Sequence, residues 1–263
     1  MAYRALALDV DGTLVCSAQK KISPETTAAL RILQSRGVVV ILATGRSGFA
    51  STGAILGTDF TPDWRVCING AQILDAAGRT VYERRFSSED VENITAFISR
   101  LSLPLTFTFE DAYYVYSDYD EYVSYYTSHA GPVPYLRDGS DRARHLQSLP
   151  FGAYILGMPG SVRDELAAFC PSIKLMETNP NAYDVGPADA DKKHGVARVL
   201  SRLDIGFDEL VAVGDSENDR ELLSAAGVSV AMGNAPARIR EIAFHVTGTV
   251  QENGVVSAIE RFF

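Results

Sequence analysis

The sequence is poor in cysteine. Its 263 residues include only three, Cys16, Cys67 and Cys170, which form neither a CxxC pair nor a Cys/His spacing suited to zinc. Small secreted domains that depend on disulfides carry more cysteines at closer spacing. The pattern argues against a disulfide scaffold and favours a reducing, intracellular setting.

Basic residues are outnumbered by acidic ones. The chain has 24 lysines and arginines against 33 aspartates and glutamates, a formal net charge of −9. Proteins that bind nucleic acid usually carry a basic surface, so we expect no nucleic-acid partner. A phosphorylated ligand is not excluded, because a bound divalent cation can reverse the local charge of an acidic site.

Long hydrophobic runs are missing as well. Residues 38–43 are typical of the longest apolar segments, and Asp9 comes too early for the apolar region of a signal peptide. We therefore expect a cytoplasmic protein with no membrane partner. The sequence also has no Walker A loop and no GxGxxG fingerprint, so nucleotide binding of those kinds has no support.

Near its beginning the sequence alternates between buried strands and an amphipathic helix. Residues 5–10 and 38–43 are almost entirely apolar, which is typical of parallel strands that are covered on both faces. Between them, Ser-Pro-Glu at 23–25 predicts the start of a helix. A third strand is expected at 66–68. This spacing of strands and helices indicates βαβ units.

The middle of the chain has a different character. It is aromatic and polar, and alternating segments at 106–110 and 113–116 predict an antiparallel hairpin. A helix is expected over 162–169 and a strand over 174–178. Such a mixture is typical of an α+β domain.

After residue 186 the α/β pattern returns. A helix is expected over 192–203, and strands over 210–213 and 228–232. The fold class is therefore α/β, a Rossmann-like core with a parallel sheet between helices, plus an inserted α+β domain. The predicted boundaries are 1–82 for the first part of the core, 83–186 for the insertion and 187–263 for the second part of the core.

Polar residues follow the apolar strands at the points where the strands end. Asp9 and Asp11 follow the first strand, Thr44 the second, and Asp215 a later one. In open parallel sheets ligands bind beyond the carboxyl ends of the strands, so we expect these residues to converge. Three carboxylates in one crevice repel each other unless a cation joins them, and oxygen-only ligands favour Mg²⁺.

The segment Asp-Val-Asp-Gly-Thr-Leu at 9–14 is the most informative. Residues two apart on a strand point to the same side, so Asp9 and Asp11 address one small volume. One acid can then act as a nucleophile while the other transfers protons. Asp-Gly is also common turn chemistry, and alone it indicates no more than a turn. The second acidic segment at 214–219, Gly-Asp-Ser-Glu-Asn-Asp, weakens that simpler interpretation.

Together these segments resemble the haloacid dehalogenase (HAD) superfamily. The resemblance rests on DVDGTL at 9–14, TGR at 44–46, a later lysine and GDSEND at 214–219, in this order. Two further segments, INGA at 68–71 and MGNA at 232–235, resemble the Cof-type sugar-phosphatase branch with a type IIB cap. The likeness covers both core segments, whereas the insertion matches the cap in position and size only.

The resemblance implies a role for each carboxylate. Asp9 would attack phosphorus and form an aspartyl-phosphate, while Asp11 would protonate the leaving group and then activate water. Mg²⁺ would be held by Asp9, by the Asp11 carbonyl and by Asp215, with Asp219 in support.

Other residues would bind phosphate or support the site. The phosphate-binding set that the resemblance implies is Val10, Thr44, Gly45, Lys192 and Asn218, and Arg46 and Asn69 are further supporting residues. Lys193 is the alternative to Lys192, although alignment on Gly195 favours Lys192.

The resulting functional hypothesis is a Mg²⁺-dependent phosphatase that acts on a small phosphorylated metabolite, in particular a sugar phosphate. A phosphosugar mutase or phosphotransferase on the same fold is one alternative, and a non-catalytic sensor of a phosphorylated ligand is another.

Overall fold

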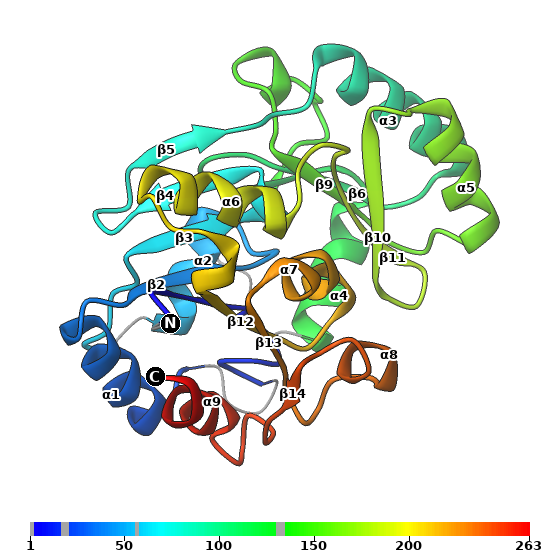
Figure 1. Ribbon diagram of the computed structural model, residues 1–263. Helices are drawn as coiled ribbons and strands as arrows, with labels where there is room; N and C mark the ends of the chain where they lie inside the picture. Colours follow the sequence, from blue (N-terminus) through cyan, green and yellow to red (C-terminus); the bar gives the residue numbers. More distant parts are fainter. Residues whose placement is uncertain (1–2, 17–20, 56–57, 130–134) are drawn as a thin grey trace. The chain divides into compact units, whose positions relative to one another are not determined.

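The computed structural model describes residues 3–16, 21–55, 58–129 and 135–263. The chain divides into two compact units (Figure 1). The core unit comprises Met1–Tyr82 and Asp191–Phe263, and the inserted unit comprises Glu83–Ala190. The domain boundaries expected from the sequence stay a prediction, although the last strand of the inserted unit runs to Pro187, one residue beyond the expected boundary.

An eight-stranded sheet forms the centre of the core unit, in the order β14-β13-β12-β1-β2-β3-β4-β5. Neighbours from β14 to β3 pair in parallel, and β4 joins β3 antiparallel. The strands are β1 (Ala5–Leu8), β2 (Val39–Ala43), β3 (Trp64–Cys67), β4 (Gln72–Asp75), β5 (Thr80–Glu83), β12 (Leu210–Gly214), β13 (Val228–Ala231) and β14 (His245–Val246).

Both faces of this sheet are covered, as the apolar strands predict. Within β1, Leu6 and Leu8 pack in a cluster with α1 (Pro24–Ser35) and α9 (Gly254–Phe262), while Ala5 and Ala7 pack in a second cluster with α6 (Lys192–Arg202) and α7 (Arg220–Ala225). Successive residues of a strand point to opposite faces, so a strand between two helix layers is apolar throughout. The helices α2 (Gly48–Ile55) and α8 (Ala237–Arg240) complete the unit.

Helix α1 begins where the sequence predicts. The Ser23 hydroxyl accepts a hydrogen bond from the Thr26 amide at 3.1 Å, and Pro24 occupies the first turn. A serine cap satisfies one of the amides that a helix start leaves unpaired, and proline has no amide to satisfy.

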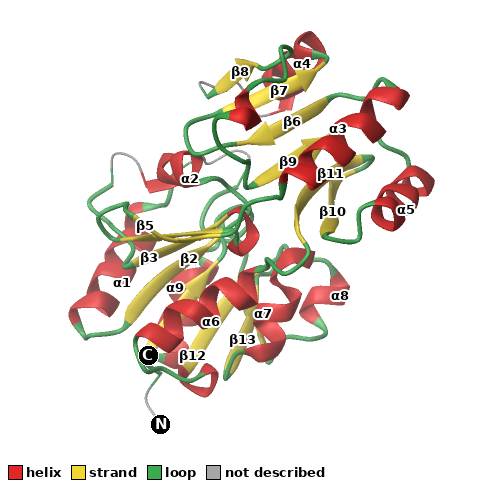
Figure 2. Ribbon diagram, turned by 90° about the horizontal axis from the view of Figure 1, so that it is seen from above, coloured by secondary structure: helices red, strands yellow, loops and turns green. Residues whose placement is uncertain are grey.

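The inserted unit contains a six-stranded mixed sheet in the order β10-β11-β9-β6-β7-β8 (Figure 2). Its strands are β6 (Leu105–Thr108), β7 (Tyr113–Ser117), β8 (Leu136–Asp138), β9 (Gly152–Ile155), β10 (Ile173–Asn179) and β11 (Ala182–Pro187). Its helices are α3 (Ser88–Leu101), α4 (Tyr119–His129) and α5 (Gly160–Phe169). The hairpin expected around Asp111 is the antiparallel pair β6–β7.

The inserted unit has its own hydrophobic core. Helices α3 and α5 contribute Ile94, Phe97 and Leu166 to a cluster with the sheet residues Phe107 and Ile155. A smaller cluster forms where Tyr122 of α4 packs on the strands. The α+β character expected from the sequence is therefore present.

None of the helices in the described part of the chain has the length and apolar character that a bilayer crossing needs.

Candidate active site

The first acidic segment leaves β1 through a tight turn. The Asp9 amide donates a hydrogen bond to the Val213 carbonyl of β12 at 3.0 Å, which extends the sheet pairing to this residue. The turn passes through Gly12, which has a φ of +86°. A Cβ at Gly12 would lie 2.2 Å from Asp215 Oδ2, so both the backbone conformation and the space require glycine here.

A buried lysine joins two carboxylates in the centre of the site. Lys192, the first residue of α6, is fully buried, and its Nζ lies 2.5 Å from Asp9 Oδ1 and 2.6 Å from Asp219 Oδ1. Burial alone would lower the pKa of Lys192, but the charges of Asp219 and Asp9 outweigh burial and raise it. The ammonium therefore stays charged at neutral pH.

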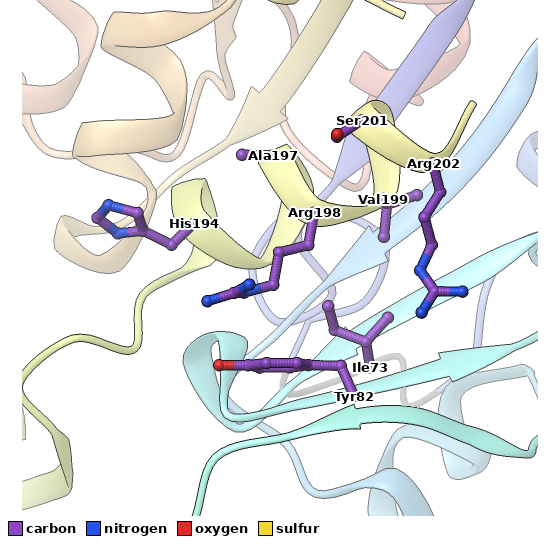
Figure 3. A pocket seen from close by; sticks show the side chains of 8 residues that line it. All are labelled: Ile73, Tyr82, His194, Ala197, Arg198, Val199, Ser201 and Arg202. Atoms are coloured by element: carbon purple, nitrogen blue, oxygen red, sulfur yellow. The ribbon is translucent and has the colours of Figure 1, made fainter. Parts of the chain in front are cut away.

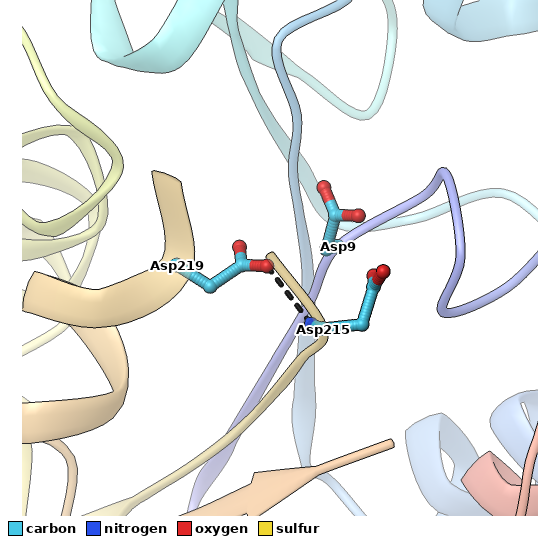
Figure 4. A group of neighbouring side chains, drawn as sticks. All are labelled: Asp9, Asp215 and Asp219. Atoms are coloured by element: carbon cyan, nitrogen blue, oxygen red, sulfur yellow. Dashed lines mark hydrogen bonds between the residues drawn. The ribbon is translucent and has the colours of Figure 1, made fainter. Parts of the chain in front are cut away.

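Three carboxylates gather around this lysine. One oxygen each of Asp9, Asp215 and Asp219 lies within 4.8 Å of the others (Figure 4). Burial raises the pKa of Asp9 well above its ordinary value, with contributions from Asp219 and Asp215, while Lys192 opposes the rise. Burial and the charge of Asp219 also raise the pKa of Asp215, to about 6.

The charges of this cluster fit a divalent cation. Three carboxylates face one ammonium, which leaves an excess of two negative charges when all are ionised. Among the described residues, hydrogen bonds engage both oxygens of Asp219 but one oxygen each of Asp9 and Asp215. The oxygen-only donors suit Mg²⁺, and Asp9 and Asp215 each have one oxygen that no hydrogen bond among the described residues engages.

The phosphate-binding loop expected after β2 is held by the backbone. The Thr44 amide donates to the Val66 carbonyl at 2.8 Å, and the buried Thr44 hydroxyl accepts from the Arg46 amide at 3.1 Å. The neighbouring Gly45 is half-buried. These contacts fix the direction in which the loop leaves the sheet.

Comparison with known proteins agrees with this geometry. The sequence profile of the haloacid dehalogenase-like hydrolases matches residues 6–259. The chain belongs to this family. It is 28% identical to Phosphatase YwpJ of Bacillus subtilis, in an alignment that covers 98% of this chain and 99% of that protein. It is 24% identical to the 5-amino-6-(5-phospho-D-ribitylamino)uracil phosphatase YcsE of the same organism, over 98% and 95% of the two chains.

A solved structure shows the same fold. The HAD subclass IIB sugar phosphatase BT4131 has a TM-score of 0.85 to this chain at 22% identity, with 98% of both chains covered. The core sheet and the second, mixed sheet therefore form an α/β HAD fold in which the inserted unit is consistent with a type IIB cap. Within the HAD family the chain is a phosphatase, and the Asp9, Asp215 and Asp219 cluster is typical of its Mg²⁺ site.

The HAD residue Asp11 lies apart from the carboxylate cluster. Its side chain is 60% exposed and forms a two-pronged ion pair with Arg46, with 2.7 Å from Nε to Oδ2 and 2.5 Å from Nη2 to Oδ1. The cluster contains the Asp219 side chain instead. The metal ligand expected from Asp11 is its carbonyl oxygen, and that expectation stays a prediction.

The structure distinguishes the two lysines by burial. Lys192 is the one in contact with Asp9 and Asp219, whereas Lys193 is partly exposed. Asp191 caps α6 by accepting a hydrogen bond from the His194 amide at 2.8 Å, and this cap fixes the helix start beside the cluster.

A strained turn connects two of the loops that carry candidate site residues. Ile68 and Asn69 have positive φ values of +50° and +47°, which is rare for a β-branched residue such as isoleucine. The Asn69 amide donates to the Thr44 carbonyl at 3.0 Å, and its side-chain oxygen accepts from Asn218 Nδ2 at 3.1 Å. Asn69 therefore links Thr44 to Asn218.

Two polar residues that lie within the recognised motifs were given no role from the sequence. The Thr13 hydroxyl donates to Asp215 Oδ1 at 2.9 Å, and Asn234 Nδ2 donates to the Gly12 carbonyl at 2.8 Å. Asn234 follows β13 closely, so the same rule that selects polar residues at strand ends could have found it.

Proposed function

We propose that the chain hydrolyses a small phosphorylated metabolite, in particular a sugar phosphate, with Mg²⁺ and through an aspartyl-phosphate on Asp9. The observation that carries this proposal is the buried contact of Asp9 with Lys192 beside Asp215. A buried carboxylate held by one cation and next to a second acidic ligand suits a nucleophile in phosphoryl transfer.

The residues that would hold Mg²⁺ are Asp9, Asp215 and the Asp11 carbonyl, with Asp219 in support through its contacts to the backbone amides of Asp215 and Ser216. When bound, the ion would supply positive charge that offsets the mutual repulsion of the carboxylates and of the substrate phosphate.

Asp9 would carry the first step. One of its carboxylate oxygens attacks phosphorus, the bond from phosphorus to the leaving oxygen breaks, and Asp11 donates a proton to that oxygen. Lys192 favours the ionised form of Asp9 against burial, since its charge lowers the pKa of that carboxyl. The ion pair with Arg46 would hold the Asp11 side chain in position.

Asp11 would also carry the second step. Its carboxylate takes a proton from water, the water oxygen attacks phosphorus, and the bond from phosphorus to Asp9 breaks. Lys192, Asn218, the Thr44 hydroxyl and the backbone at Val10 and Gly45 would hold the phosphate oxygens during both steps. Asn69 would keep Thr44 and Asn218 at a fixed separation.

Two similarities support a sugar phosphate as the substrate class. BT4131 is described as a sugar phosphatase, and the named substrate of YcsE carries a phospho-D-ribityl group. The acidic composition supports the same small, phosphorylated substrate over nucleic acid, and the cytoplasmic setting stays a prediction from the sequence.

The test is phosphate release from a panel of sugar phosphates, with Mg²⁺ and with a chelator. The matched variants are Asp9→Asn and Asp59→Asn, the latter at an exposed aspartate that pairs with Arg31. We expect release that requires Mg²⁺, is lost in Asp9→Asn and persists in Asp59→Asn. Isomerised sugar phosphate without free phosphate would indicate a mutase, and binding without turnover would indicate a sensor.

A further inference from the structure

The core unit has a groove that the proposed reaction does not use. It lies along α6 beside β4 and β5, with a volume of about 460 Å³ (Figure 3). Arg198 and Arg202 of α6 face Ile73 and Tyr82 across it. No carboxylate of the active-site cluster lines this groove. Its volume lies within the range of small-molecule sites.

In the part of the chain that the structure describes, neither arginine has a carboxylate partner. They lie one helical turn apart on α6, and like charges at this spacing destabilise a helix. Within the described ranges, no ion pair within 4.0 Å involves either guanidinium, in a chain whose acidic residues outnumber its basic ones. Among the described residues, therefore, no ion pair neutralises the two guanidinium groups at the groove, and the carboxylate that contacts a groove residue is Asp191, which pairs with His194.

Both guanidinium groups are held by other contacts. The Arg198 guanidinium lies over the Tyr82 ring, 4.2 Å from its centroid, and Arg202 Nη2 donates to the Val81 carbonyl at 3.4 Å. An arginine that stacks on an aromatic ring uses one face of its guanidinium group. The opposite face and the in-plane N–H groups can still contact a ligand. Ile73 and Val199 form the base of the groove, and both side chains are buried in the hydrophobic core of the unit.

From this arrangement we propose that the groove binds a small organic anion with a flat aromatic ring. The ring stacks on the open face of Arg198, and the anionic group accepts charge-assisted hydrogen bonds from Arg202. The proposal is independent of the phosphatase reaction. It concerns the same helix, however, because α6 also carries Lys192 at its first turn.

The probe is naphthalene-2-sulfonate, which is flat and anionic and has no phosphoester to hydrolyse. Isothermal titration calorimetry with the full chain should give saturable binding at one site. The double substitution Arg198→Gln and Arg202→Gln should raise Kd by about tenfold or more, since it removes both charged donors. The double substitution Arg240→Gln and Arg261→Gln, at exposed arginines elsewhere in the core unit, should leave Kd unchanged.

Two further measurements separate the groove from the active site. Saturating tungstate, a phosphate mimic, should leave probe binding intact, and Asp9→Asn should bind the probe as the wild type does. If the arginine variant does not fold, Ala197→Glu, which places a negative charge beside the groove, should abolish binding instead. No saturable binding, binding that survives the loss of both arginines in a folded variant, or displacement by tungstate would each overturn the proposal.

Discussion

At the scale of single residues, Lys192 joins two carboxylates in the interior of the site. It is fully buried, and its ammonium contacts the carboxylates of Asp9 and Asp219. Removing one member of a buried ion pair leaves an uncompensated charge in the interior. The resulting loss of folding free energy is usually larger than the stabilisation that the intact pair provides. The stability of the site and the proposed chemistry therefore both involve the same nitrogen atom.

We expect Lys192→Met to abolish phosphate release and to lower the free energy of unfolding by about 3–5 kcal/mol, because Asp9 and Asp219 lose their buried cation. Lys193→Met is the matched control and should change the stability by less than about 0.5 kcal/mol. Urea unfolding followed by the fluorescence of Trp64 measures the stability of both variants, and phosphate release measures their activity. The assignment is wrong if the Lys193 variant loses activity and the Lys192 variant retains it.

Asn69 allows a backbone effect to be separated from a side-chain effect. Asn69→Ala should lower the free energy of unfolding by about 1 kcal/mol more than Asn69→Gly does, since alanine tolerates a positive φ poorly and glycine tolerates it well. Both substitutions remove the acceptor of Asn218 Nδ2, so both should lower kcat by about tenfold or more. Full activity in the stable glycine variant would show that this hydrogen bond does not position the site.

At the scale of elements, the packing of α6 on the turn after β3 determines where Lys192 lies. A Cβ at Gly195 would lie 2.4 Å from Val66 Cγ1 and 3.0 Å from the Gly70 Cα. Helix and turn therefore approach each other more closely than any residue but glycine permits. At Gly70, with a φ of +96°, a Cβ would lie 2.1 Å from the Asp191 carbonyl oxygen.

Two glycine-to-alanine substitutions test this packing. Gly195→Ala should destabilise the protein by about 1–3 kcal/mol through overpacking and should lower activity, because α6 carries Lys192. Gly53→Ala in α2 meets nothing within 4 Å and should stabilise by about 0.5–1 kcal/mol, the usual helix preference for alanine. Thermal unfolding of the two variants measures the contrast. Equal effects would contradict the close approach.

In the inserted unit, Glu110 connects two arginines. Partial burial would raise the pKa of Glu110, but hydrogen bonds from Arg85 and Arg144 lower it to about 2. A carboxyl whose pKa is lowered on folding stabilises the protein above its unfolded value near 4.5, and this stabilisation is lost as the pH falls from there towards 2.

We therefore expect Glu110→Gln to lower the free energy of unfolding by about 1 kcal/mol at pH 7. This value allows for solvent screening, because the Glu110 side chain is 41% exposed. The cost should shrink as the pH is lowered from 4.5 to 3. Near-UV circular dichroism, to which the tyrosines of this unit contribute, follows unfolding at each pH. The matched control is Glu92→Gln, at an exposed glutamate on α3 of the same unit.

Much of the element order could be predicted from the sequence, for reasons that are local. The continuous apolar character of β1 and β2 and the serine cap of α1 each depend on neighbouring residues only. The strands β4 and β5, which extend the sheet after β3, were not expected. They are short, and β5 is largely exposed, so they lack the hydrophobic pattern of the central strands.

The site was less predictable, because its contacts join distant parts of the chain. Lys192 and Lys193 are neighbours in sequence, and only the packing of α6 buries one of them against Asp9. Ile68 and Asn69 have positive φ values, and their amides contact distant carbonyls. The Ile68 amide donates to the Arg46 carbonyl and the Asn69 amide donates to the Thr44 carbonyl. The exposed ion pair of Asp11 with Arg46 likewise follows from the direction in which two loops leave the sheet.

At the scale of the whole molecule, the two units have separate hydrophobic cores, and the acidic cluster belongs to the core unit alone. The only tryptophan, Trp64, lies in β3 of the same unit. Its fluorescence therefore reports on the unit that would bind the ion.

We expect Mg²⁺ to raise the unfolding temperature that Trp64 reports, because a ligand that binds the folded state stabilises it by about 2.7 kcal/mol at a concentration one hundred times its Kd. Asp215→Asn should abolish the shift, since it removes one proposed ligand and one of the excess negative charges. An equal shift in the variant would place the ion elsewhere.

The central claim is that Asp9 accepts the phosphoryl group from the substrate. The most direct measurement is rapid acid quench during turnover of an active sugar phosphate, followed by mass spectrometry of the peptide that contains residues 5–15. We predict a phosphoryl group on Asp9 that decays as free phosphate appears. Phosphorylation of Asp11 instead, or turnover without any phosphorylated intermediate on this peptide, would contradict the account.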